Sequence, residues 1–278
     1  MFLISNDFGR ALEVPGFTPD QSVLYKSVEE TDLKLHLFLP EGHQTSDQRP
    51  AIVFFFGGGW NGGHPSQFFP HCEYLASRGM VAMSAEYRVR SRNQTTPREC
   101  VKDGKSAVRW IRANASKFGI DPNRIAAGGG SAGGHVAAAT ALTDGFEEEG
   151  EETSVSSRPN ALVLYNPVFD NGPDGYGHGR VKDYWEQISP FHNINETAPP
   201  TVVILGTKDN LIPVATAEKY KAKMEEHGRL CVLHLYEGQR HGFFNFPKSE
   251  KYYRITAIEM DRFLESLGYL TGEPTLKE

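Results

Sequence analysis

Residues 126–135, Ala-Ala-Gly-Gly-Gly-Ser-Ala-Gly-Gly-His, decide the fold that this sequence predicts. They contain the pattern Gly-x-Ser-x-Gly, with Ser131 at its centre, between a short apolar run, Ile125–Gly128, and an alanine-rich stretch, Ala132–Leu142. The run is typical of a buried strand and the stretch of a helix. A sharp turn between them brings its flanks together, where glycine avoids a clash, and lifts the serine hydroxyl to a helix N-terminus. This context predicts a nucleophilic serine, and the alternative is a glycine-rich turn with a capping serine.

Strands and helices alternate along the rest of the chain. Period-two or continuous apolar runs predict strands, and a period near 3.6 predicts helices. Such alternation predicts an α/β fold with a mostly parallel sheet covered by helices on both faces. The other predicted strands are Ser22–Val28, Leu33–Leu39, Ala51–Phe56, Met80–Glu86, Ala161–Tyr165, Thr201–Leu205 and Leu230–Tyr236, and the other predicted helices are Arg98–Lys117, Pro213–His227 and Tyr252–Leu267.

Two segments interrupt the alternation. Asp144–Pro159 contains five glutamates within six residues, so we expect a solvated, mobile loop, with a partner-binding site as the alternative. The stretch 166–200 is too long for an ordinary connection and is rich in aromatic residues. We therefore expect residues 1–278 to form one domain, with a small cap at about 166–200.

A second run of glycines follows the predicted strand Ala51–Phe56. Residues 56–60 read Phe-Gly-Gly-Gly-Trp. Acyl transfer passes through a tetrahedral oxyanion, and fixed N–H donors about 3 Å from that oxygen lower the barrier. Consecutive glycines let a backbone approach the oxygen without obstruction by Cβ atoms. The run predicts an oxyanion-stabilising loop, and the alternative is a flexible turn.

A serine hydroxyl needs a base to take its proton and a carboxylate to orient that base. His241 follows the last predicted strand, and Asp209 follows the strand Thr201–Leu205. Ligands of an open parallel sheet lie beyond the carboxyl ends of its strands, so both side chains are predicted to reach the site. The order Ser131, Asp209, His241 is the order expected for such a site. The alternatives are a turn aspartate and a surface histidine.

Other polar residues near these motifs have less direct roles in this interpretation. His135 lies four residues after Ser131 on the same helix and cannot approach the hydroxyl from the opposite side, so we expect it to pack. His64 follows the glycine run and is a candidate for the wall of the substrate pocket. Asp103 lies early in a predicted helix, where we expect a structural role.

Composition excludes several classes of function. The 278 residues carry a net charge of −6 without a basic block, which argues against nucleic-acid binding. Cys72, Cys100 and Cys231 are too few for a disulfide framework or a zinc site, and we expect no metal or other cofactor. No apolar run is long enough to span a bilayer, and Met1–Arg10 has no signal pattern, so we expect a cytoplasmic protein. The oligomeric state stays open.

Together these motifs resemble the α/β-hydrolase fold, and within it the hormone-sensitive-lipase-like and acetyl (xylan) esterase branch of serine esterases. The resemblance covers about 50–244 and is most specific in residues 128–134, Gly-Gly-Gly-Ser-Ala-Gly-Gly. It implies that the N–H groups of Gly58, Gly59 and Ala132 form the oxyanion hole. Phe56 stands where the family carries a histidine, so the hydrogen bonds that brace the glycine loop must come from elsewhere or be lost.

The resemblance implies a serine carboxylesterase for short acyl esters, acetyl above all, because the predicted cap is small. Acetylated carbohydrates are one candidate substrate class, since Trp60, Tyr176 and Trp185 would stack against a pyranose ring. Two alternatives stay open: a serine peptidase on the same fold, and a ligand-binding module without catalytic activity.

Overall fold

An eight-stranded sheet forms the centre of the protein, in the order β1-β2-β4-β3-β5-β6-β7-β8. The structure is a computed structural model and describes residues 16–277, so the interpretation of Met1–Arg10 lies outside it. β1 and β2 pair antiparallel, as do β2 and β4, and all other neighbours are parallel, which confirms the predicted α/β fold. The strands are β1 (Gln21–Val28), β2 (Thr31–Phe38), β3 (Arg49–Phe55), β4 (Val81–Ala85), β5 (Ile120–Gly130), β6 (Ala161–Tyr165), β7 (Thr201–Gly206) and β8 (Cys231–Tyr236).

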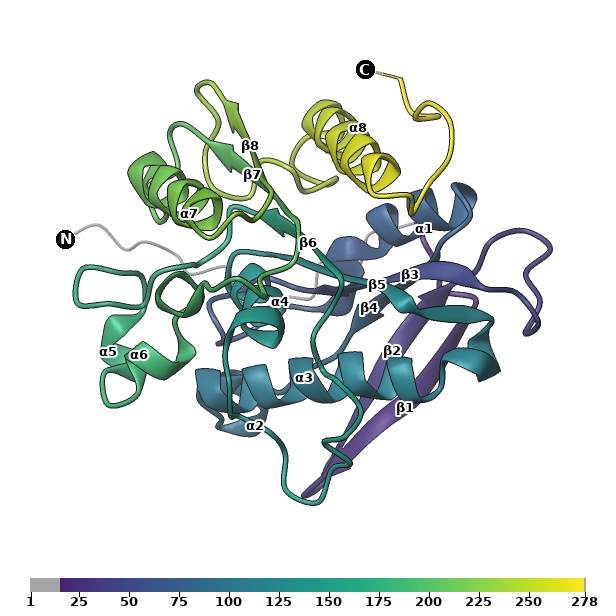
Figure 1. The fold of residues 1–278 in the computed structure, drawn as a ribbon, viewed down its shortest axis with the longest axis horizontal. Helices are drawn as coiled ribbons and strands as arrows, with labels where there is room; N and C mark the ends of the chain where they lie inside the picture. The colour runs from purple at the N-terminus through teal and green to yellow at the C-terminus, as the bar shows by residue number, and fades with distance from the viewer. Residues whose placement is uncertain (1–15, 278) are drawn as a thin grey trace.

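Helices cover both faces of this sheet (Figure 1). One face packs against α1 (Phe69–Ser77) and α8 (Glu250–Ser266), and the other against α3 (Pro97–Ala113), α4 (Ala132–Leu142) and α7 (Val214–Glu226). Strand β3 shows why both faces are covered. Phe54 is buried in the core beneath α1 and α8, and Phe55 is buried in the core on the opposite face, beneath α3, α4 and α7. A continuous apolar strand therefore supplies two hydrophobic cores at once.

The helix boundaries follow local capping chemistry. Predicted helix Arg98–Lys117 is α3 followed by a separate 3-10 turn, η2 (Ala115–Phe118). At the start of α3, Thr96 and Glu99 form a capping box and Pro97 occupies the first turn. Outside the 166–200 segment, the sequence interpretation missed α1, α2 (Arg90–Asn93) and the 3-10 turn η1 (Pro65–Phe68).

The segment between β6 and β7 packs against α4. It contains α5 (His178–Val181), α6 (Trp185–Ile188) and the 3-10 turn η3 (Pro190–Asn193). His135 of α4 is fully buried and its Nε2 donates a hydrogen bond to the carbonyl of Ile188, at 3.1 Å. Burial lowers the pKa of His135 to about 4, so the imidazole is neutral at pH 7. The expected packing role of His135 is confirmed.

Three of the five glutamates in the loop after α4 are not solvated as the sequence predicts, but form ion pairs. Glu147 and Glu151 bind Arg109, and Glu147 also binds Lys105 at 2.8 Å. Glu148 lies 2.7 Å from Lys26 and 2.7 Å from Arg88, with its side chain only 16% exposed. The prediction was wrong for these three glutamates, because α3 and its neighbours turn cations towards them and this attraction outweighs repulsion among the carboxylates. Glu149 and Glu152 are exposed, as the sequence predicts.

Asp103 lies beneath this loop and has the structural role that its position suggests. Its buried carboxylate accepts from Lys26 at 2.6 Å and from Arg88 at 2.8 Å. Together with Glu148 these residues form a cluster that joins β1, α3, the residues after β4 and the glutamate-rich loop.

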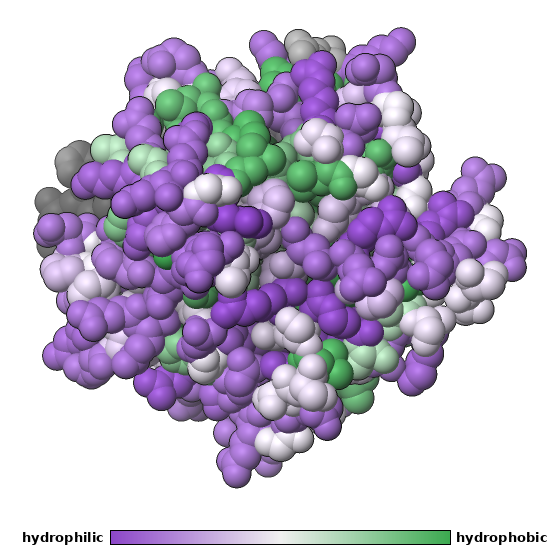
Figure 2. Space-filling view, viewed as in Figure 1, coloured by the Kyte–Doolittle hydropathy of each residue, from purple (hydrophilic) through white to green (hydrophobic). Residues whose placement is uncertain are grey.

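The face of the molecule in Figure 2 is mainly hydrophilic, and apolar side chains gather near β8. This strand is the last in the sheet order, and two leucines at its ends, Leu230 and Leu235, are 49% and 40% exposed. Among residues 16–277, no helix combines the length and the apolar character needed to cross a membrane.

We expect Glu148→Gln to lower the free energy of unfolding at pH 7 by about 1 kcal/mol, because it removes one of the two carboxylates that bind Lys26 and Arg88, while Asp103 still pairs with both. Although burial alone raises the pKa of Glu148, hydrogen bonds and charges from Lys26, Lys102 and Arg88 outweigh it and lower that pKa from 4.5 to about 2. The carboxylate thus stabilises the fold above pH 4.5, and this contribution is lost as the pH falls towards 2.

Denaturant unfolding between pH 7 and pH 2 measures the effect, with the exposed neighbour changed in the same way, Glu149→Gln, as the control. The difference in the free energy of unfolding between the two variants should shrink as the pH falls from 4.5 towards 2. Equal stabilities of the two variants at pH 7 would contradict the ion-pair account.

Candidate active site

Ser131 lies on a strained turn between β5 and α4. Its φ is +56° and its ψ is −120°, outside the regions that non-glycine residues favour. A Cβ atom at Gly129 would lie 2.5 Å from the carbonyl oxygen of Gly133, and one at Gly133 would lie 2.0 Å from the carbonyl oxygen of Phe55. Glycines two residues before and two residues after the serine are therefore a steric requirement of the turn.

Three side chains distant in the sequence form a hydrogen-bonded row at this turn. His241 Nε2 lies 2.9 Å from Ser131 Oγ, and His241 Nδ1 lies 2.7 Å from Asp209 Oδ2. Asp209 follows β7 and His241 follows β8, so the carboxyl ends of parallel strands bring them to Ser131, as the sequence predicts. In this row the serine hydroxyl donates to Nε2, and Nδ1–H donates to the carboxylate.

The carboxylate of Asp209 is held from both sides. Its Oδ1 accepts from the backbone N–H groups of Leu211 and Ile212 at 2.8 and 3.0 Å, while Oδ2 faces His241. The Asp209 side chain is fully buried and that of His241 is 19% exposed. A buried, fully bonded carboxylate fixes the orientation of the imidazole, and the exposed edge of the imidazole lies open to substrate and water.

The glycine loop lies directly against the serine. A Cβ atom at Gly57 would lie 2.9 Å from the carbonyl oxygen of Gly130 and 3.3 Å from Ser131 Cβ. Gly58 and Gly59 follow with positive φ values of +138° and +63°. In the part of the chain that the structure describes, the N–H groups of Gly58, Gly59 and Ala132 donate to no acceptor. These amides are available to negative charge that develops next to Ser131 Oγ.

Hydrogen bonds from other parts of the chain brace this loop. The hydroxyl of Tyr87 donates to the carbonyl of Phe56 at 2.6 Å, and the two rings stack with centroids 4.1 Å apart. The N–H of Gly57 donates to Gln67 Oε1 at 2.6 Å, and the guanidinium of Arg180 donates to the carbonyl of Gly59. The bracing lost with a phenylalanine at position 56 is thus replaced from elsewhere.

The four candidate substrate-binding residues fall into different surroundings. Trp60 is 2% exposed and packs edge-on against His135, so the structure corrects the expectation that it stacks on a sugar. Tyr176 is half-buried, and its hydroxyl lies 3.2 Å from where a Cβ at Gly59 would be, beside the glycine loop. Trp185 packs against His192, at 4.8 Å between ring centroids, and against His178, so its described ring contacts lie within the 166–200 segment itself.

His64, the fourth candidate, caps a short 3-10 turn. Its Nδ1 accepts from the backbone N–H of Ser66 at 3.2 Å, at the start of η1. This turn carries Gln67 towards the glycine loop. The structure thus gives His64 a capping contact, and a place in the pocket wall stays a prediction.

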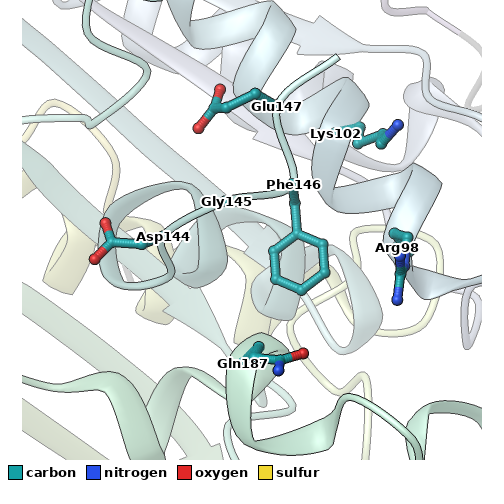
Figure 3. A pocket seen from close by; sticks show the side chains of 7 residues that line it. All are labelled: Arg98, Lys102, Asp144, Gly145, Phe146, Glu147 and Gln187. Atoms are coloured by element: carbon teal, nitrogen blue, oxygen red, sulfur yellow. The ribbon is translucent and has the colours of Figure 1, made fainter. Parts of the chain in front are cut away.

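A hollow of about 340 Å³ lies elsewhere, between α3, α6 and the start of the glutamate-rich loop (Figure 3). The loop residues that line this hollow come directly after the C-terminal end of α4, and Ser131 comes directly before its N-terminal end. The length of α4 therefore separates the hollow from Ser131. Within residues 16–277, no group of three histidine, cysteine or acidic side chains is arranged to hold a metal ion. The lining residues of the hollow are Arg98, Lys102, Asp144, Gly145, Phe146, Glu147 and Gln187.

The chain is similar to known esterases. Two family models match the chain, BD-FAE over residues 35–170 and the Dienelactone hydrolase family over residues 174–264. Esterase LipC of Mycobacterium tuberculosis is 32% identical over 70% of this chain and 53% of its own length. An acetylxylan esterase of Xylanibacter ruminicola is 26% identical over 87% of this chain and 48% of its own length. The chain thus spans about half the length of these relatives.

Similar solved structures match over nearly their whole length. The apo form of esterase 2 from Thermogutta terrifontis has a TM-score of 0.89 and 42% sequence identity, and the match covers 94% of this chain and 98% of that chain. The same esterase with propionate bound has a TM-score of 0.88 and 42% identity, over 93% of this chain and 97% of that chain.

We expect Gly133→Ala to lower the free energy of unfolding by about 3 kcal/mol, because the new methyl group meets two carbonyl oxygens in a packed turn. The Cβ atom would lie 2.0 Å from the oxygen of Phe55 and 2.4 Å from that of Phe56. Gly179→Ala is the matched control, since nothing lies within 4 Å of its Cβ position. Thermal and denaturant unfolding measure both variants, and equal loss in both would show that the contact is not the cause.

Proposed function

The chain belongs to the esterases of the α/β-hydrolase fold, and we propose that it hydrolyses carboxylic esters with Ser131 as the nucleophile. His241 acts as general base and acid, and Asp209 holds its tautomer. The observation that carries the proposal is the row itself, with His241 Nε2 2.9 Å from the hydroxyl oxygen and Nδ1 2.7 Å from a buried carboxylate. The identity of 42% to an esterase, over 98% of that esterase's chain, supports it.

The proposed reaction has two halves. Ser131 Oγ attacks the acyl carbon while its proton moves to His241 Nε2, and the carbonyl oxygen becomes an oxyanion that accepts from Gly58, Gly59 and Ala132. The oxyanion collapses, the alcohol leaves with the proton from His241, and an acyl-serine remains. Water then attacks the acyl-serine while His241 takes the water proton, and collapse releases the acid and returns that proton to Ser131.

We propose short acyl groups as the substrates, with acetyl esters first. Propionate bound to the similar esterase 2 and the name of the acetylxylan esterase relative support short acyl chains and a carbohydrate alcohol respectively. We propose that the 166–200 segment forms a small cap on one domain that spans the chain. Tyr176 is the candidate cap residue for substrate contact, because its hydroxyl lies beside Gly59.

The relatives reported above carry esterase names, which favours ester hydrolysis over a peptidase or a silent binding module. A cytoplasmic location stays a prediction. The three cysteines are buried and unpaired, as is usual in a reducing compartment.

We expect Ser131→Ala to lower kcat for p-nitrophenyl acetate by about a million-fold, because no hydroxyl remains to form the acyl-enzyme. Asp209→Asn should lower kcat by about ten-thousand-fold, since the amide favours the wrong imidazole tautomer. Steady-state kinetics with purified variants, and their circular dichroism spectra as a folding check, measure this. Wild-type turnover by Ser131→Ala would refute the proposed nucleophile.

A panel of p-nitrophenyl esters from two to twelve carbons tests the acyl preference, with acetylated xylo-oligosaccharides as a second substrate set. We expect kcat/KM to be highest at two to four carbons and to fall for longer chains, because three short elements form the proposed cap. A maximum at eight or more carbons would overturn the short-acyl proposal and leave ester hydrolysis intact.

A further inference from the structure

Two side-chain amides connect the glycine loop to the loop that carries His241. Gln67 lies on η1, and its Oε1 accepts from Gly57 N–H at 2.6 Å. Its Nε2 donates to Oδ1 of Asn245 at 2.7 Å, a residue 178 positions further along the chain. Asn245 Nδ2 donates to the carbonyl of Gly242 at 2.7 Å, the residue that follows His241. Three hydrogen bonds thus run without a break from one loop to the other.

Chemistry fixes the orientation of both amides. The backbone N–H of Gly57 only donates, so it must face the oxygen of Gln67, and the carbonyl of Gly242 only accepts, so it must face the nitrogen of Asn245. The remaining ends, Gln67 Nε2 and Asn245 Oδ1, are then complementary. Reversing either amide would place donor against donor or acceptor against acceptor.

Burial makes this pairing costly to lose. Asn245 is 9% exposed and Gln67 is half-buried, and an amide out of water costs free energy unless its hydrogen bonds are made. Gly242 has a φ of +75°, and a Cβ there would lie 3.0 Å from Asn245 Nδ2. The N–H of Gly242 donates to Asn166 Oδ1 at 3.0 Å, so side-chain amides hold both polar groups of this residue.

We propose that Gln67 and Asn245 are positioning residues that set the distance between the oxyanion-stabilising amides and His241. Gly57 directly precedes Gly58 and Gly59, and Gly242 directly follows His241, so the pair fixes both groups that act on Ser131. Phe56 offers no side-chain hydrogen bond to the loop. Because amides do not titrate, this brace keeps the same bonds across the pH range in which the histidine works.

This inference rests on the proposed function, and it fails separately from it. If Ser131→Ala removes turnover and the variants below leave turnover unchanged, the function stands and the positioning role falls.

The test is a double-mutant cycle with Gln67→Met, Asn245→Leu and both changes together. We expect each single change to lower kcat on the order of 10- to 100-fold, because small displacements of reacting groups have effects of that size, with KM changed less than about threefold. The double variant should be no slower than the slower single variant, since one broken bond already interrupts the connection. Gln48→Met, at an exposed position just before β3 and at the opposite end of that strand from the glycine loop, is the control and should keep wild-type kcat.

Gln67→Glu separates positioning from general stability. The introduced carboxylate still accepts from Gly57 N–H but no longer donates to Asn245 Oδ1, and a protonated carboxyl group regains that donor. The ratio of the kcat of this variant to the wild-type kcat should therefore rise as the pH falls through the titration of the introduced carboxylate. The assays are run at a temperature well below the melting temperature of both proteins. Three results would each overturn the proposal. They are a kcat ratio that does not change with pH, a kcat loss in the double variant equal to the product of the two single losses, and single variants whose kcat lies within about twofold of wild type.

Discussion

The structure depends on one close approach of two backbones, where the turn of Ser131 meets the end of strand β3. Gly133 lies so near the carbonyls of Phe55 and Phe56 that no side chain fits between them. That contact places the glycine loop, which continues from β3, directly against Ser131. It therefore brings together, before any substrate binds, the nucleophile and the amides that would stabilise charge developing beside it. This close packing around Gly129 and Gly133 holds Ser131 at its strained φ of +56°.

The remaining parts of the site come from the parallel arrangement of the strands. Asp209 and His241 each follow the carboxyl end of a strand, so the sheet delivers them to the rim where Ser131 lies. Side chains from outside these motifs then hold the loops. Arg180 reaches the carbonyl of Gly59 from the segment between β6 and β7, and Gln67 with Asn245 spans the gap between the loops. The chemistry uses few residues, and many more keep them in place.

Local patterns were enough to predict the sheet, the helices α4, α7 and α8, and the three residues of the row. They suffice there because glycine sterics, strand order and chain order fix those positions with little help from distant residues. Pairing between distant side chains is not visible in such patterns. The glutamate-rich loop was misjudged because its cations, such as Arg109 and Lys26, lie on elements far away in sequence. Trp60 was misjudged because His135 covers it only in the folded chain.

The central claim is that Ser131 reacts covalently while Gly58, Gly59 and Ala132 hold the charge. A crystal structure of the protein after reaction with a fluorophosphonate tests this most directly, because the probe stops the reaction at a tetrahedral adduct. The account predicts one adduct, on Ser131 Oγ, with the phosphoryl oxygen about 3 Å from those three backbone nitrogens. An adduct on another residue, or a phosphoryl oxygen pointing away from the glycine loop, would contradict it.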